Sequence, residues 1–335
     1  RIPILCEMGL DPGLDHMCIA KFIDQAINNG APPLHTFESV CGGIPSLKAV
    51  DNPLKYKFSW SPKGVLTAAS ASCKYRAKGE ILSHSPPATY ESVLKSAHFP
   101  GLELEVSPNR DSLAYESVYA GMASGEGIPN FMRGTLRHSG WAEAMHAAFR
   151  LGLLSDRKID KKVSTWAEVV RATGADGKLL DIYAKEDPGI AGEMVRWALD
   201  ESEDITRLLS NSTGASPEWS PVDLFASALW EKSQYRPGEQ DLALMSNTLQ
   251  FGRADETGSF VARGSLYVEG DGSPEGSAMA RTVGFTAAAG AEIILEGGLN
   301  AEGGIIRPTI PQVYDPALKV LEECGIIFNE EQLPP

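Results

Sequence analysis

The chain has 335 residues, 43% of them hydrophobic and 22% charged, a balance that excludes a disordered or fibrous protein. Its formal net charge of -14 makes nucleic acid and anionic membrane surfaces unfavourable partners, because the surface would repel phosphate groups. The most apolar stretch, 286–295, is interrupted by Glu292, so no run reaches the roughly 18 uninterrupted apolar residues of a membrane span.

The first predicted element is a strand at residues 2–6, an apolar run that leads into a polar turn. Asp11 and Pro12 fit the N-cap and first-turn proline of a helix that continues to Gly30. In α/β proteins the loop between a strand and a helix N-terminus is a common ligand site. Because the chain opens on Arg1 directly before a strand, we expect it to be part of a longer protein.

The middle of the chain changes character twice. Residues 34–119 contain short strand-like segments at 35–40, 66–68 and 102–106 between Gly, Pro, Ser and Asn clusters, which indicates strands of an α/β layer with long loops. From about residue 130 to 260 apolar residues recur at helical spacing. We therefore predict a helical insert at 129–260.

Strand and helix patterns alternate again near the C-terminus. Residues 264–269 alternate apolar and polar side chains, as a half-buried strand does. An Ala-rich helix is predicted at 277–295, another helix at 316–324, and a last short strand at 326–328. The sequence thus predicts an α/β protein with a helical insert.

Familiar catalytic motifs are absent from the sequence. It contains no GxGxxG, GxxxxGK[ST], HExxH or GxSxG pattern and no Cys/His set at zinc spacing. We therefore expect no metal site, and no phosphate-binding loop within these residues. The five cysteines are scattered and odd in number, which favours a reducing, intracellular compartment.

Three polar clusters remain in predicted loops, each with a plain structural alternative. Asp11 is either a site residue or only a helix cap. The segment 52–60, which contains Lys57, is either a site segment or an edge strand protected by charge. The residues at 109–111 and 133–137 are either ligand groups or a turn and a charged surface.

Taken together, the clusters place cations in the loops of a strongly anionic protein, which points to an anionic small ligand. The planar fork of arginine matches a carboxylate with two hydrogen bonds. Arg110 and Arg137 are therefore candidate clamps for a substrate with several carboxylates, with Lys57 as an additional point charge.

At these residues the sequence resembles the saccharopine dehydrogenase (glutamate-forming) family, which includes the dehydrogenase half of bifunctional aminoadipic semialdehyde synthase. The similar segments occur in the family's order and span nearly the whole chain. They are EMGLDPGLDHM at 7–17, CGGIP at 41–45, NPLKYKFSWSPKGVL at 52–66, PNRDSL at 108–113, RGTLRHSGW at 133–141, SAMARTVGF at 277–285 and RPTIPQVYDPAL at 307–318.

The resemblance implies three structural parts: a Rossmann domain for a nicotinamide nucleotide, an α/β domain for substrate and dimerisation, and a helical insert. On this basis residues 1–12 would hold the last strand of a truncated Rossmann domain whose N-terminal part is absent. Residues 13–128 and 261–300 would form the substrate and dimerisation domain, and 301–335 would return to the Rossmann domain.

The resemblance also implies a reaction of lysine metabolism. A saccharopine dehydrogenase uses NAD or NADP to oxidise the secondary amine of saccharopine, which yields glutamate and aminoadipate semialdehyde. The nucleotide would be bound mainly by the missing domain, and we expect a homodimer, fused in the bifunctional form to a lysine-ketoglutarate reductase domain. The expected location is intracellular, in either cytoplasm or mitochondrion.

By the same resemblance the site residues can be named. Residues expected beside the nicotinamide are Gly9, Leu10, Asp11 and Pro12. Residues expected around the substrate are Asp11, Cys41, Gly42, Lys57, Arg110, Thr135 and Arg137. Either Asp11 or Lys57 would take the proton from the amine or from water, and the sequence does not choose between them.

The sequence leaves two other functions open. The first is a non-catalytic binding or oligomerisation module that lacks the nucleotide-binding half, as the missing glycine-rich loop suggests. The second is a related enzyme that acts on carboxylated polyamines. The residues upstream of Arg1 would separate enzyme from module, and a substrate screen would separate the two enzymes.

Overall fold

The computed structural model describes residues 2–122, 127–159, 162–200, 205–208, 219–299 and 303–334. The strands are β1 (Pro3–Leu5), β2 (Leu34–Pro45), β3 (Cys73–Ala77), β4 (Glu80–His84), β5 (Leu94–Ser96), β6 (Leu104–Pro108), β7 (Asn130–His138), β8 (Asp241–Phe251), β9 (Phe260–Glu269), β10 (Gly304–Ile306) and β11 (Asn329–Leu333). The helices are α1 (Leu14–Asn28), α2 (Pro62–Ala69), α3 (Ala88–Glu91), α4 (Trp141–Arg150), α5 (Trp166–Thr173), α6 (Gly177–Lys185), α7 (Ile190–Ala198), α9 (Pro221–Lys232), α10 (Ala278–Leu295) and α11 (Pro311–Glu323), with 3-10 helices η1 (Leu47–Ala49) and η2 (Ser112–Met122).

A long mixed sheet organises the structure, in the strand order β11-β9-β8-β2-β7-β3-β4, with β6 also paired to β7 and β5 to β6. β2 lies in the middle, antiparallel to β8 and parallel to β7. The other strand pairs of this sheet are antiparallel. Since β2 and β7 are neighbours, residues far apart in the sequence face the same cavity.

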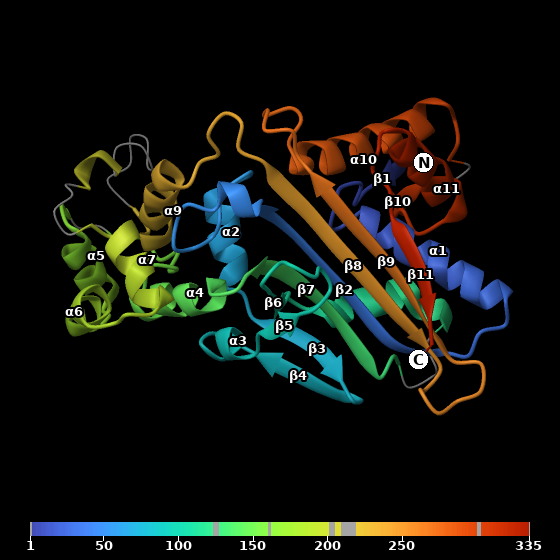
Figure 1. The fold of residues 1–335 in the computed structure, drawn as a ribbon, viewed down its shortest axis with the longest axis horizontal. Coiled ribbons are helices and arrows are strands. Elements are labelled where there is room, and N and C mark those ends of the chain that lie inside the picture. Colours follow the sequence, from blue (N-terminus) through green and yellow to red (C-terminus); the bar gives the residue numbers. More distant parts are fainter. Residues whose placement is uncertain are drawn as a thin grey trace.

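Helices pack at two separate places along the sheet (Figure 1). Helices α1, α10 and α11 contact one another and cover β8 and β9, and the apolar cluster between them includes Leu14, Met245 and Leu266. Helices α4, α5, α6, α7 and α9 gather beyond the other end of the long strands, around a larger cluster that includes Trp166 and Trp219. Each group is held by burial of apolar side chains, the main favourable term in folding.

The two ends of the chain meet in a separate small sheet. β1, the predicted strand at residues 2–6, pairs in parallel with β10, so that Pro3 lies opposite Gly304 and Leu5 opposite Ile306. Ile2, Ile4 and Ile305 are more than half exposed on this pair. The two ends of the described chain are therefore joined by backbone pairing.

Several predicted elements agree with the structure, among them the strands at 35–40 and 264–269 and the helix at 277–295, which is α10. The Ser277 hydroxyl accepts a hydrogen bond from the Ala280 N–H at 3.1 Å and so caps α10. In contrast, residues 66–68 belong to helix α2 and not to a strand. Ser61 caps that helix and Pro62 opens its first turn, a start signal that outweighs the short apolar run.

Other boundaries also need correction. The interval 129–260 is helical only in part, because β7 and β8 at its two ends belong to the central sheet. The last helix begins at Pro311, five residues before the predicted Pro316, which lies inside it. The last strand is β11 and not 326–328, and it forms an edge of the sheet beside β9.

Helix α10 is the one helix among the described residues that is long and apolar enough to cross a membrane, with 18 residues of mean hydropathy 1.2. A third of this stretch is buried in the fold, where the helix packs on β8 and α11. A single helix of this kind is weak evidence for a membrane span, because the core helices of soluble proteins meet the same criterion.

Candidate functional site

A cavity of about 630 Å³ lies where the loop after β1 meets the middle of β2, the turn after β6, and β7. Most predicted site residues, from four separate parts of the sequence, line this one cavity. They are Gly9, Leu10, Asp11, Pro12, Cys41, Gly42, Arg110, Thr135 and Arg137. A concave site with a few convergent polar groups is typical of small-molecule binding.

The loop at residues 9–13 differs from the predicted helix cap. Helix α1 begins at Leu14, and its N-cap is Gly13, with a φ of 152°. A Cβ atom at Gly13 would lie 2.1 Å from the carbonyl oxygen of Gly9, so only glycine fits this turn. Asp11 is consequently not the cap but a cavity residue, and the predicted cap role is wrong.

The floor of the cavity depends on a close approach between β2 and β7. A Cβ atom at Gly42 would lie 2.5 Å from the Leu136 carbonyl oxygen, so a side chain there would force the two strands apart. Beside it, Cys41 is buried, and burial raises the pKa of its thiol well above the usual value. Cys41 therefore presents a neutral thiol and not a nucleophilic thiolate.

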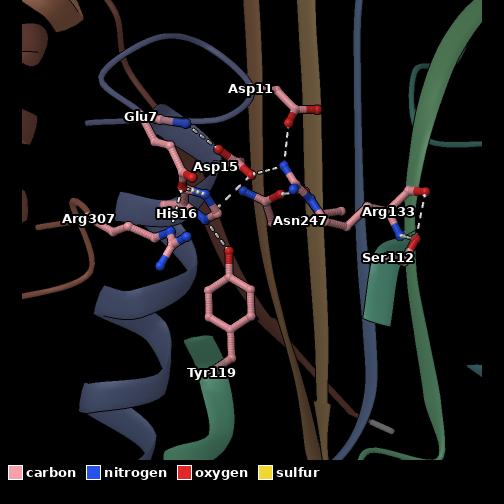
Figure 2. A network of polar contacts seen from close by, with 11 residues as sticks. Glu7, Asp11, Asp15, His16, Ser112, Tyr119, Arg133, Asn247 and Arg307 are labelled. Carbon is pink, nitrogen blue, oxygen red and sulfur yellow. Dashed lines mark hydrogen bonds and ion pairs between the residues drawn. The ribbon is translucent and has the colours of Figure 1, made fainter. Parts of the chain in front are cut away.

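One end of the cavity contains a compact charged cluster (Figure 2). Arg133 reaches from β7 to Asp11 and Asp15, and a single guanidinium nitrogen, Nη2, donates to both carboxylates. Burial and the charge of Asp15 raise the pKa of Asp11 to about 7, and Arg133 opposes them. A carboxyl group with a pKa near neutrality suits proton transfer.

Arg133 is absent from the predicted set, although Thr135 and Arg137 are in it. Residues two apart on a strand face the same side, so 133, 135 and 137 point to one face of β7. This two-residue spacing is the feature of the sequence that could have identified Arg133 as a site residue. No feature of the sequence identifies Asp15, because an acidic residue in the first turn of a helix is common.

A second layer of polar groups lies behind Asp15. The buried His16 contacts the Tyr119 hydroxyl through Nδ1, and its Nε2 lies 2.9 Å from Glu7 Oε2. Arg307, which follows β10, donates from Nε to the same Glu7 oxygen at 3.0 Å. The small terminal sheet is thus tied to the charged cluster of the cavity.

The other end of the cavity has a different charge balance. Arg137 is only 8% exposed, and its guanidinium carbon lies 5.0 Å from the ring centre of Tyr56 and 5.5 Å from that of Trp141. Its Nη1 donates to the Leu136 carbonyl oxygen at 2.7 Å, while its Nε has no hydrogen-bond partner in the described part of the chain. No described carboxylate lies within ion-pair distance of it. The buried Glu105, its cross-strand partner on β6, attracts it at longer range, so this cation lacks a direct ion-pair partner in the described part of the chain.

Arg110 and Thr135 complete this wall. The backbone of Arg110 has a φ of 43°, and its carbonyl oxygen accepts a hydrogen bond from the Lys74 N–H at 2.7 Å. The residue is exposed and makes no ion pair with any residue that the structure describes. The cavity therefore has a second cation that is free to meet a ligand.

Lys57 is not at this cavity, contrary to the prediction. Its ammonium group is 1% exposed and is bound by Asp51 at 3.1 Å and Glu239 at 2.6 Å. A lysine paired with two carboxylates stabilises the loop around it but has no charge left to attract an anion. The neighbouring residue, Tyr56, does not line the cavity either, but its buried ring packs beside Arg137, which does.

Within the described residues no group of three or more His, Cys, Asp and Glu side chains is placed to hold a metal ion. The fold and the cavity together define a class: an α/β protein with a small-molecule site that combines a carboxyl group of pKa about 7 with arginines that make no ion pair among the described residues. The chain belongs to the saccharopine dehydrogenase family. Residues 9–326 match the model of the saccharopine dehydrogenase C-terminal domain, which confirms the resemblance seen in the motifs.

Individual relatives agree with this membership. The chain is 32% identical over 343 residues to the mitochondrial alpha-aminoadipic semialdehyde synthase of Rattus norvegicus, covering 98% of this chain and 35% of that protein. It is 31% identical over 342 residues to the saccharopine dehydrogenase [NADP(+), L-glutamate-forming] of Saccharomyces cerevisiae, covering 99% and 74%. The chain thus spans about a third of the first relative and about three quarters of the second.

A solved structure is similar as well. The apo saccharopine dehydrogenase (L-Glu forming) from Saccharomyces cerevisiae superimposes with a TM-score of 0.82 at 30% sequence identity, covering 99% of this chain and 74% of that one. This similarity confirms the predicted α/β fold at the level of the whole chain.

Proposed function

We propose that this chain forms the substrate site of a saccharopine dehydrogenase of lysine metabolism, an intracellular oxidoreductase that acts on a CH–NH group. The observation that carries the proposal is Arg137, a buried cation in a cavity wall with no described carboxylate in ion-pair distance. A buried charge is unfavourable unless it is paired. A carboxylate of the substrate is the partner that fits it.

Saccharopine matches the charges of the cavity. Its carboxylates would pair with Arg137 and with Arg110, both without an ion pair among described residues. Thr135 supplies a hydroxyl between them, while Gly42 and the neutral Cys41 shape the floor. The amine of saccharopine would then lie toward Asp11.

Asp11 is the proton acceptor in this proposal. With a pKa of about 7 it is partly ionised at neutral pH, and Oδ2 makes no hydrogen bond to a described residue. It takes the proton that the secondary amine loses as the adjacent carbon is oxidised, and the imine then adds water and separates into glutamate and aminoadipate semialdehyde. Lys57 has no part in this step, because Asp51 and Glu239 hold it outside the cavity.

The residues present fit one end of a nicotinamide nucleotide. Gly9, Leu10, Asp11 and Pro12 follow the parallel strand β1 and line the cavity, so they would hold the nicotinamide beside the substrate. NAD or NADP, when bound, supplies the hydride acceptor. We propose that β1, β10 and α11 belong to a Rossmann domain and that the remaining nucleotide contacts come from residues outside these 335. The exposed Ile2, Ile4 and Ile305 on the small sheet support this arrangement.

The remaining parts of the proposal concern organisation. We propose that residues 13–128 and 261–300 form the substrate and dimerisation domain of a homodimer. The mitochondrial relatives are about three times as long as this chain, and the fusion to a lysine-ketoglutarate reductase domain belongs to the same proposal.

Calorimetric titration of saccharopine into this chain tests the substrate assignment without the nucleotide. We expect saccharopine to bind and glutamate, which has fewer carboxylates, to bind more weakly. In the polypeptide that carries these residues in the cell, saccharopine should also drive reduction of NAD or NADP. Absence of both binding and reduction would falsify the proposal, and reduction by a carboxylated polyamine alone would assign the related enzyme.

A further inference from the structure

The charged end of the cavity is unusual because two carboxylates share one guanidinium nitrogen. Asp15 is fully buried, and the side chains of Asp11 and Arg133 are 17% and 7% exposed. If both carboxylates are ionised, the three groups carry a net charge of about -1 away from water. Such a charge is unfavourable, so one carboxylate is expected to hold a proton near neutral pH.

The hydrogen bonds indicate which carboxylate holds it. Asp15 accepts from the Gly13 N–H at 2.6 Å and from Arg133 Nη2 at 2.7 Å. Asp11 accepts from Arg133 alone among the described residues. Hydrogen bonds to a carboxylate favour its ionised form, so Asp15 is the better stabilised anion and Asp11 is the group that takes the proton.

The groups around the pair come from four elements. Arg133 is on β7, and the neutral thiol of Cys41 is on β2. From η2, the Tyr115 ring lies 4.0 Å from the Arg133 guanidinium carbon, and burial raises the pKa of Tyr119 well above its usual value, so that it stays neutral. On α1, His16 Nδ1 lies 3.8 Å from Asp15, with Glu7 on the far side of the ring.

We propose that Asp15 is a positioning residue that divides Arg133 between two carboxylates and thereby leaves Asp11 basic enough to accept the amine proton at neutral pH. If Asp15 were absent, the guanidinium would turn fully to Asp11 and hold it as a weakly basic carboxylate. The electrostatics agree with the geometry, because burial and, after it, the charge of Asp15 raise the pKa of Asp11 to about 7. The role in amine deprotonation rests on the proposed function; the effect on Asp11 does not.

Nuclear magnetic resonance of the unliganded chain with isotope-labelled aspartate tests this directly, with the Asp11 carboxyl signal assigned by its loss in Asp11→Asn. We expect the wild-type signal to titrate near pH 7. In Asp15→Asn the midpoint should fall by at least about one pH unit, since a like charge at hydrogen-bond distance from the shared arginine is removed. Asp24→Asn is the matched control on the same helix, bound to Tyr314 and away from Arg133, and should leave the midpoint unchanged.

An unchanged midpoint in Asp15→Asn, or a wild-type Asp11 that titrates below about pH 5, would overturn the proposal. If Asp15→Asn does not fold, Asp15→Ser removes the charge and keeps an acceptor for the Gly13 N–H, and the same fall is expected. No step uses saccharopine, so a chain that fails to bind saccharopine but shows the fall would refute the proposed function and retain this inference.

Discussion

Arg133 and Arg137 lie four residues apart on β7 and line the same cavity, yet their surroundings differ. Arg133 donates to Asp11 and Asp15, whereas Arg137 has two aromatic rings and a backbone carbonyl but no described carboxylate in ion-pair distance. The same side chain therefore has two roles. Arg133 binds two carboxylates of the protein itself. Arg137 is the residue that we propose binds a carboxylate of the ligand.

Under the proposed function, the difference explains how a strongly anionic protein would attract a carboxylate substrate. A cation already neutralised by its neighbours attracts no further anion, as Lys57 illustrates with Asp51 and Glu239. Among the cations that line the described cavity, Arg137 and Arg110 make no ion pair and therefore keep a local positive potential. Charge balance within the fold, more than residue type, decides which cations bind ligand.

The largest expected effect is on the paired arginine. Arg133→Met leaves two buried carboxylates without their shared cation, so the free energy of unfolding at pH 8 should fall by about 3–5 kcal/mol. Urea unfolding followed by circular dichroism measures it. Arg150→Met, on the exposed side of α4, is the control and should change stability by less than about 0.5 kcal/mol. Equal stabilities of Arg133→Met and wild type would remove the contrast between the two arginines.

The unpaired arginine should show the opposite pattern. Arg137→Met removes a buried cation with no described carboxylate partner, so stability should be unchanged or higher. Affinity for saccharopine should fall by about 1.5–3 kcal/mol, roughly 10- to 150-fold, which is the scale of hydrogen bonds to a charged group. Urea unfolding measures the stability of Arg137→Met and titration calorimetry measures its affinity for saccharopine, with Arg150→Met as the control in each experiment. Undiminished affinity would place the substrate carboxylate elsewhere.

The effect that is smallest at each step of the measurement is spread over a range of pH. Because the pKa of Asp11 is raised from 3.8 to about 7 in the folded protein, the unfolded chain releases this proton first as pH rises. The wild type should therefore lose stability relative to Asp11→Asn between about pH 4 and pH 7, by up to roughly 1.4 kcal/mol per pH unit, and the difference should be constant above that. Urea unfolding at a series of pH values measures it. If the difference in unfolding free energy between the wild type and Asp11→Asn does not change with pH, Asp11 is ionised over this whole pH range.

Local sequence signals predicted some elements well and others poorly. Helix α10 has a serine cap and a long helical pattern, and β9 alternates over its length, so both were found. The prediction of a strand at 66–68 is wrong because a segment of three residues cannot distinguish strand from helix, and the deciding cap at Ser61 lies five residues upstream. The strands β7 and β8 were hidden inside a mainly helical region, since their pairing with β2 is not local.

The sequence by itself determined the family, through the order of its motifs, and most of the cavity residues, through the residue types in those motifs. Only the tertiary structure decided which charged residues are neutralised. It placed Lys57 between Asp51 and Glu239, joined Arg133 to Asp11 and Asp15, and left Arg137 against two rings. The reason is physical: an ion pair depends on distances of a few ångströms between side chains that can be more than a hundred residues apart, and no local pattern encodes those distances.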